Sequence, residues 1–113
     1  DWGSYITTMN TNFIELTRDN LSNFISAPKL LVIYGSRGCG ACKQMKPKLK
    51  NVSDLLPMVY VEAQMFPRAT QLYPGVIKEY PTFALFENGY FKATVNFKTI
   101  WFDIEKIIKN EYI

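Results

Sequence analysis

The chain contains no histidine, so nucleophiles activated by a neighbouring histidine and metal sites with an imidazole ligand are both excluded. Cysteine is scarce as well, with two residues among 113. A chain of this length can bury a core without disulfides or a structural metal, unlike scaffolds shorter than about 70 residues. The two cysteines therefore call for an explanation other than support of the fold.

Long hydrophobic runs are also missing. The longest apolar run covers residues 30–34, far short of the roughly 18 residues that a membrane-spanning helix needs, so we expect no membrane span. Net charge is low, because 13 basic residues against 10 acidic ones give +3. This is well below the charge of a dedicated nucleic-acid-binding protein, and we expect no nucleic-acid partner. The length leaves room for a single domain.

The order of apolar patterns predicts an α/β domain at residues 13–113, preceded by an N-terminal arm at residues 1–12. We expect strands at residues 13–17, 30–34, 58–61, 82–86 and 91–95. One expected helix follows an N-cap at Asp19, and the others begin near Cys39, Pro67 and Ile100. Alternating strands and helices indicate parallel pairing, whereas Asn88-Gly89 predicts a tight antiparallel hairpin. The sheet should therefore be mixed, with helices on both faces.

The two cysteines stand as Cys39-Gly40-Ala41-Cys42, directly after a strand and a Gly-containing turn. A thiol in the first turn of a helix meets unpaired backbone N–H groups and the positive end of the helix dipole, which favour the thiolate. We expect Cys39 to be the nucleophile and Cys42, one turn further in, to be the resolving thiol. Arg37 and Lys43 flank the pair and could lower its pKa below the roughly 8.5 of a free cysteine.

This arrangement predicts thiol–disulfide exchange, in which Cys39 attacks a substrate disulfide and Cys42 then resolves the mixed disulfide. A purely structural disulfide is a weaker interpretation, because a bond that closes so short a loop adds little stability. Half of a zinc site is another interpretation, but the chain has no further cysteine and no histidine, so zinc would need carboxylates or a second chain. The pattern therefore favours a redox pair without a metal.

Tyr80-Pro81-Thr82 places a proline at the entrance of an expected inner strand, where a trans proline would usually interrupt the pairing. A cis peptide bond would reconcile the proline with the strand. Only about 5% of X-Pro bonds in folded proteins are cis, however, so the sequence alone leaves a trans proline in an edge strand as the default.

The stretch from residue 13 to about residue 109 resembles the thioredoxin family. The resemblance rests on the opening strand, on the strand leading into Cys-Gly-x-Cys-Lys, on the helix-kinking Pro47, and on Tyr80-Pro81-Thr82 followed by Asn88-Gly89. It implies a thioredoxin fold, with a mixed central sheet of about five strands flanked by about four helices. It also implies a cis-Pro81 loop beside the cysteine pair.

The resemblance further implies which residues bind substrate. In the family, the backbone just before the cis-proline, here that of Tyr80, pairs with an extended substrate segment. The substrate-binding candidates are Gly38, Gly40, Ala41, Tyr80, Pro81 and Phe97.

Several positions depart from the family pattern. Ala41 stands where thioredoxins usually carry proline, and Gly38 where they usually carry tryptophan. Ile33 occupies the place of a buried aspartate thought to help proton transfer to the second thiol, which leaves water or another group, with Glu62 a weak candidate, to activate that thiol. Phe97 falls where the family has a groove-lining glycine and could narrow or reshape the substrate surface.

The expected function is that of a monomeric thioredoxin-like protein-disulfide oxidoreductase with no bound metal or organic cofactor. Its partners would be protein disulfide substrates and a protein electron donor or acceptor. The uncharged Gly40-Ala41 pair favours the reducing direction, with an oxidase or isomerase as the alternative direction. A non-catalytic docking module of the same fold is a second interpretation, because the departures from the family pattern would also follow from relaxed catalytic demands.

Two further features leave alternatives open. Lys43, Lys46, Lys48 and Lys50 could attract acidic substrates or nucleic acid, but a solvated helix face is the better interpretation. Cysteines confined to one exchange motif favour a cytoplasmic protein, whereas the missing initiator methionine would also fit an exported mature form.

Overall fold

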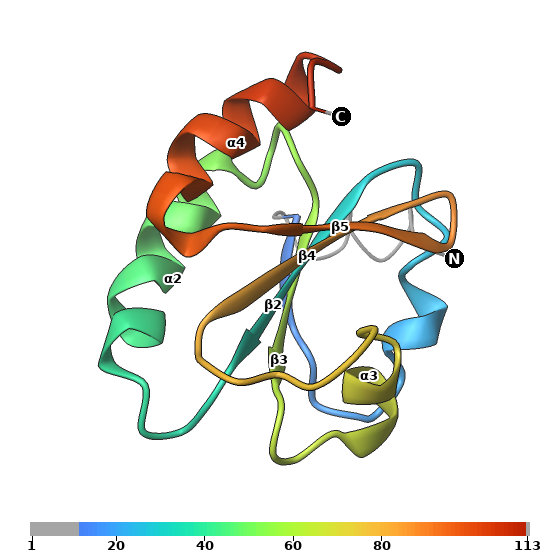
Figure 1. Cartoon of the computed structure of the whole chain (residues 1–113), viewed down its shortest axis with the longest axis vertical. Coiled ribbons are helices and arrows are strands. Elements are labelled where there is room, and N and C mark those ends of the chain that lie inside the picture. The colour runs from blue at the N-terminus through green and yellow to red at the C-terminus, as the bar shows by residue number, and fades with distance from the viewer. Residues whose placement is uncertain (1–11, 113) are drawn as a thin grey trace.

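The structure of the chain is a computed structural model that describes residues 12–112, so the expected arm at residues 1–12 lies outside the described residues except for Asn12 (Figure 1). The elements within the described residues are, in chain order, β1 (Phe13–Glu15), η1 (Leu21–Asn23), β2 (Leu30–Gly35), α2 (Gly40–Val52), β3 (Met58–Glu62), α3 (Pro67–Gln71), β4 (Thr82–Glu87), β5 (Tyr90–Val95), η2 (Phe97–Thr99) and α4 (Ile100–Ile108). No helix in this part of the chain is long and apolar enough to cross a membrane.

The strands form one mixed sheet in the order β1-β3-β2-β4-β5. β3 pairs in parallel with β1 and β2, whereas β4 pairs antiparallel with β2 and β5. The turn between β4 and β5 consists of Asn88 and Gly89, whose φ angles of 53° and 90° are the positive values that a two-residue hairpin requires. Both the mixed sheet and the hairpin predicted from the sequence are therefore confirmed.

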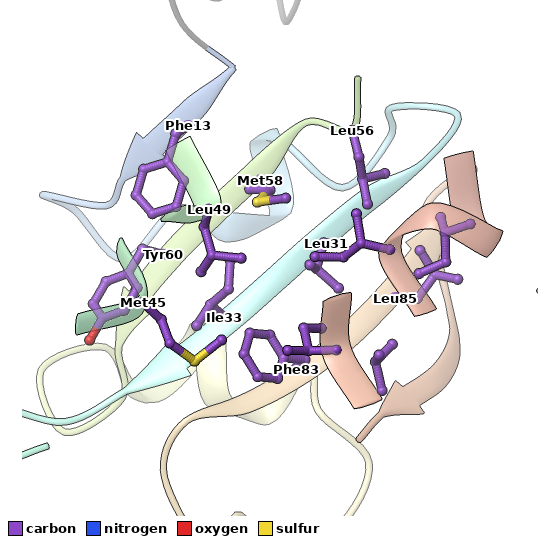
Figure 2. Close-up of a cluster of buried hydrophobic side chains, with 14 of the residues drawn as sticks. Phe13, Leu31, Ile33, Met45, Leu49, Leu56, Met58, Tyr60, Phe83 and Leu85 are labelled. Carbon is purple, nitrogen blue, oxygen red and sulfur yellow. The ribbon is translucent and has the colours of Figure 1, made fainter. Parts of the chain in front are cut away.

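Helices cover both faces of the sheet, with α2 and α4 over one face and α3 with η1 over the other (Figure 1). β2 lies between the two layers of helices and is buried along its whole length. Leu31 and Ile33 enter the core beneath α2 and α4 (Figure 2), whereas Leu30, Val32 and Tyr34 enter the opposite core. A strand with both faces buried has to be apolar at every position, which explains the continuous hydrophobic run.

The prediction of a helix capped by Asp19 is wrong. η1 is a single turn of 3-10 helix, and Asp19 does not cap it. The Asp19 carboxylate instead accepts hydrogen bonds from the backbone N–H groups of Arg68, at 2.9 Å, and Ala69, at 2.8 Å, in the first turn of α3. The described residues therefore contain three α-helices where about four were predicted.

Candidate functional site

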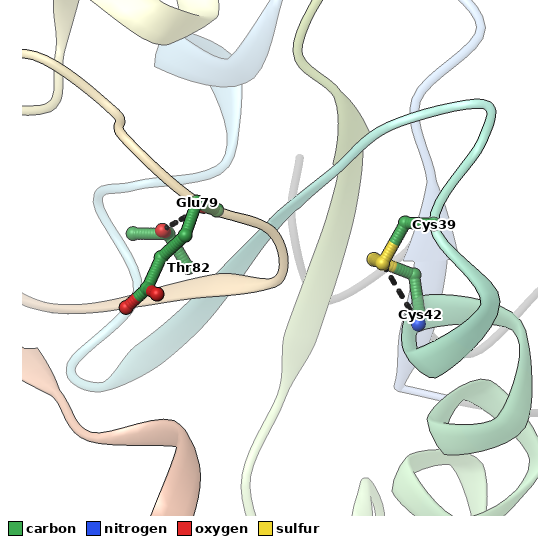
Figure 3. The surroundings of a disulfide bond; sticks show 4 residues. All are labelled: Cys39, Cys42, Glu79 and Thr82. Carbon is green, nitrogen blue, oxygen red and sulfur yellow. Dashed lines mark hydrogen bonds between the residues drawn. A yellow bond between two sulfur atoms is a disulfide. The ribbon is translucent and has the colours of Figure 1, made fainter.

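β2 and the turn after it deliver Cys39 to the start of α2. β2 ends at Gly35, and Cys39 is the N-cap of α2 with an extended backbone, φ −87° and ψ 102°. Its Sγ atom accepts a hydrogen bond of 3.0 Å from the backbone N–H of Cys42 (Figure 3). Once the disulfide is reduced, a donor at this position and the helix dipole would both stabilise a thiolate on Cys39.

Cys39 and Cys42 form a disulfide, with their Cα atoms 5.3 Å apart. The two residues differ in access. Cys42 is only 1% exposed and belongs to the core beneath α2 and α4, whereas Cys39 is half-buried at the margin of that core. Of this pair, only Cys39 is open to a substrate disulfide arriving from solvent.

Strand pairing brings the Pro81 loop to the end of the sheet at which β2 leads into the turn before Cys39. Thr82 begins β4 and pairs with Tyr34 near the end of β2, so the loop before β4 lies beside the turn that leads to Cys39. Tyr80 and Cys39 both pack against the margin of the same core. The site therefore combines two segments that are about 40 residues apart in the chain.

The peptide bond between Tyr80 and Pro81 is cis, and Pro81 is buried. The loop around it is closed by the hydroxyl of Thr82, which donates a 2.6 Å hydrogen bond to the carbonyl of Glu79 (Figure 3). The cis bond confirms what the family resemblance implied and replaces the trans default that the sequence alone left in place.

The two charged residues predicted to influence the cysteines lie at the surface. The Arg37 guanidinium forms an ion pair with Glu62 at 3.2 Å and approaches the Sδ atom of Met65 at 3.8 Å. Glu62, the weak candidate for activating Cys42, is thus engaged by Arg37. Lys43 is exposed on α2, directly after Cys42. Their effect on the cysteine pKa stays a prediction.

Two grooves meet at Phe97, the first residue of η2. The Phe97 ring stacks on Phe83, with centroids 6.4 Å apart and planes within 5° of parallel. One groove, of about 350 Å³, runs from Phe97 past Pro81. The other, of about 320 Å³, runs from Phe97 past Ala41, between α2 and α4. Three of the predicted substrate-binding residues, Ala41, Pro81 and Phe97, therefore line these two grooves.

The remaining substrate-binding candidates, Gly38, Gly40 and Tyr80, do not line either of these two grooves. Gly38 and Gly40 are exposed on either side of Cys39. A Cβ atom built on either glycine would meet no other atom within 4 Å, so both positions face open space. Tyr80 is half-buried and borders a third groove with Ile77. The substrate-binding roles of all six residues stay predictions.

Trp101 was not among the predicted site residues, although it lines the groove past Ala41. It lies in the first turn of α4, next to the buried Ile100, and is 43% exposed. A signal was present in the sequence, because a tryptophan outside the buried stripe of an amphipathic helix needs a reason other than the core.

The described residues contain no group of three or more histidine, cysteine, aspartate or glutamate side chains that could hold a metal ion. Both cysteines are engaged in the disulfide.

The family model for thioredoxin matches residues 12–109, which is most of the chain, and the chain belongs to the thioredoxin family. Members of this family normally carry no cofactor. Family membership and the Cys39–Cys42 pair are together consistent with a thiol–disulfide oxidoreductase. No match was found among curated protein sequences.

Solved structures of thioredoxins share the fold. Thioredoxin from Schistosoma mansoni is 26% identical, with a TM-score of 0.70 over 87% of this chain and 94% of that one. Mitochondrial thioredoxin 3 from Saccharomyces cerevisiae, in its oxidized form, is 24% identical, with a TM-score of 0.68 over the same shares. The zinc-bound form of human ERp44 is 19% identical at a TM-score of 0.71, and the match covers 87% of this chain but 29% of that one. At these identities, the last two comparisons show the fold alone.

Proposed function

We propose that the protein reduces disulfide bonds in other proteins by dithiol exchange through Cys39 and Cys42. The observation that carries the proposal is the unequal access of the two sulfurs. Cys39 is half-buried at a helix N-cap, where a substrate can reach it, whereas Cys42 is 1% exposed beneath it. An accessible nucleophile backed by a sheltered second thiol is the arrangement that exchange requires.

The reaction proceeds in two exchanges. In the first, the Cys39 thiolate attacks one sulfur of the substrate disulfide, forms a mixed disulfide with it, and releases the other substrate sulfur as a thiolate. In the second, the Cys42 thiolate attacks the Sγ atom of Cys39, forms the disulfide seen in the structure, and releases the remaining substrate sulfur. Two electrons pass from the protein to the substrate. A dithiol electron-donor protein would restore the reduced pair by the same chemistry.

The second exchange needs Cys42 to lose its proton. Ile33, at the position of the family's buried aspartate, is itself buried and offers no base. The substrate thiolate released in the first exchange, or a water molecule beside it, takes the proton instead. Cys42 therefore loses its proton only when a substrate is attached to Cys39. This protects the reduced pair from oxidation when no substrate is bound.

The reducing direction rests on the residues between the cysteines. Neither Gly40 nor Ala41 carries a positive charge that would stabilise the reduced form selectively and make the disulfide a strong oxidant. We expect a reduction potential near about −270 mV, as in reductases, and not in the range of about −180 to −120 mV that is typical of isomerases and oxidases.

The test is a redox titration of the Cys39–Cys42 pair in defined thiol buffers, combined with an assay of disulfide reduction in a protein substrate. The Cys39→Ser variant provides the baseline for both measurements. Turnover with a potential near about −270 mV supports the proposal, whereas a potential above about −180 mV reverses the direction. If the cysteine pair never forms a reversible disulfide, in a protein that still binds partners, the protein is instead a docking module.

Placement in the cytosol stays a prediction, which fractionation of cells would test.

A further inference from the structure

The groove between α2 and the η2–α4 segment begins at Ala41, which lies between the two cysteines in the chain. It has a volume of about 320 Å³. The residues that line it come from two elements that are far apart in the chain: Ala41, Gln44, Met45, Lys48, Phe97, Lys98, Ile100 and Trp101. The groove therefore leads directly away from the reacting sulfurs.

The floor and walls of this groove are apolar. Met45 and Ile100 belong to the core and form the floor. Phe97 and Trp101 line the groove too, and each remains 43% exposed. Aromatic side chains offer a large, rigid contact area at little cost in conformational entropy. Two of them left partly in solvent beside a reactive disulfide indicate a contact surface for an apolar side chain.

The charged residues that line the groove are all positive. Lys48 and Lys98 are exposed, one on each bank, and Gln44 is uncharged. None of the eight lining residues is acidic. The positive potential between the two lysines would favour a carboxylate and disfavour a basic side chain.

The position of the groove sets which part of a substrate enters it. Lys48 follows Ala41 by seven residues of helix, or roughly 10 Å at about 1.5 Å per residue. An extended peptide covers that distance in about three residues. A substrate whose cysteine is joined to Cys39 can therefore lay the adjoining residues along this groove.

We propose that the groove binds a segment of the protein substrate that adjoins its reactive cysteine and carries an apolar side chain followed by acidic ones. The apolar side chain packs between Phe97 and Trp101, and the carboxylates lie between Lys48 and Lys98 about three residues from the cysteine. This inference rests on the proposed reductase function and names the class of substrate that the site prefers.

The experiment compares three peptides that carry the same disulfide-linked reporter on a cysteine followed by Leu-Asp-Glu, Leu-Lys-Lys or Ser-Ser-Ser. We expect kcat/KM for the acidic peptide to exceed that for the basic one by about tenfold at low ionic strength, and the preference to shrink as salt is added. The Lys48→Gln/Lys98→Gln double variant should lose most of the preference. The Trp101→Ala variant should lower kcat/KM for both leucine peptides relative to the serine peptide.

The Lys92→Gln/Lys109→Gln double variant is the matched control. It removes the same amount of charge from two ion pairs that do not line the groove, the half-buried pair with Glu87 and the exposed pair with Glu105. It should keep the full preference for the acidic peptide. Equal loss of preference in both double variants would mean that net charge, and not this groove, selects the substrate, and would overturn the inference.

A small aromatic disulfide, too short to reach the groove, separates the two proposals. If it and all three peptides are reduced at matching relative rates in every variant, the groove has no role and the reductase function stands. If neither the small disulfide nor any peptide is reduced, the proposed function fails and the inference falls with it.

Discussion

The hydroxyl of Tyr60 fills the space that a side chain at Gly35 would need. A Cβ atom on Gly35 would overlap both the hydroxyl and the ring of Tyr60. The ring has little freedom to move, because it is buried in the core beneath α2 and the Lys46 ammonium lies 4.1 Å from its centre. Gly35 ends β2 just before the turn to Cys39, so this contact packs β3 closely against the base of the site.

The contact predicts that Gly35→Ala lowers the free energy of unfolding by about 1–3 kcal/mol, as overpacking of a dense core usually does. Urea denaturation of the oxidised protein measures the effect. In a Tyr60→Leu background the same substitution should cost much less, because the overlapping atoms are gone. Gly38→Ala, which faces open space, is the control and should change stability by less than about 0.5 kcal/mol. Equal costs of Gly35→Ala in the two backgrounds would refute the contact.

The parts of the fold that were predictable from the sequence depend on short-range signals. The all-apolar run of β2, the positive-φ pair Asn88 and Gly89, and Pro67 at the first position of α3 each identify an element from a few neighbouring residues. The cysteine spacing identified the redox pair in the same way, because its chemistry needs only four consecutive residues and a helix start.

The parts that the sequence did not predict depend on contacts between distant residues. Asp19 has the right neighbours to cap the next helix, yet its carboxylate satisfies α3 some 50 residues later. The groove past Ala41 exists only because α4 packs beside α2, so Trp101 could not be assigned to it from periodicity. Local patterns carry no information about which distant element an exposed side chain will meet.

Asp19 itself supports a second prediction. Asp19→Ala removes the acceptor for two N–H groups in the first turn of α3 and should lower the free energy of unfolding by about 1 kcal/mol. Hydrogen exchange of the Arg68 and Ala69 amides should accelerate beyond the global change, because these donors are left to solvent. Asp54→Ala, at an exposed position, is the control. Unchanged protection of both amides would show that the cap contributes nothing.

A third prediction concerns alkaline pH. The Tyr34 hydroxyl is buried and donates a 3.0 Å hydrogen bond to the carbonyl of Ala69. Burial, with a smaller contribution from Tyr73, raises the pKa of Tyr34 far above the value of 10.0 expected in the unfolded chain. The folded state therefore holds the proton that the unfolded state loses. The stability this provides is complete below about pH 10 and is lost as the pH rises above it.

The unfolding free energy should consequently fall by up to about 1.4 kcal/mol per pH unit above pH 10 on account of Tyr34 alone. Tyr34→Phe should be less stable than the parent at pH 8, because the Ala69 carbonyl loses the tyrosine donor and keeps only the 3.3 Å hydrogen bond from the Leu72 N–H. It should also show a shallower decline above pH 10. Tyr90→Phe, at a position 77% exposed, should keep the parent slope. Urea denaturation at pH 8, 10 and 11 measures all three; identical slopes in the parent and Tyr34→Phe would contradict the assignment.

The unequal access of the two cysteines supports a fourth prediction, which separates their roles. In Cys42→Ser, the accessible Cys39 can still attack a substrate disulfide, but no second thiol can release the product. The mixed disulfide should therefore accumulate close to one substrate per protein molecule, as seen by mass spectrometry without reductant, and should be released by added dithiol. Cys39→Ser should trap almost none, because Cys42 is buried beneath the missing nucleophile. Both variants should fold, since a disulfide that closes so short a loop contributes little to stability. Trapping by Cys39→Ser at the rate of Cys42→Ser would exchange the two roles and would mean that the start of α2 opens when substrate arrives.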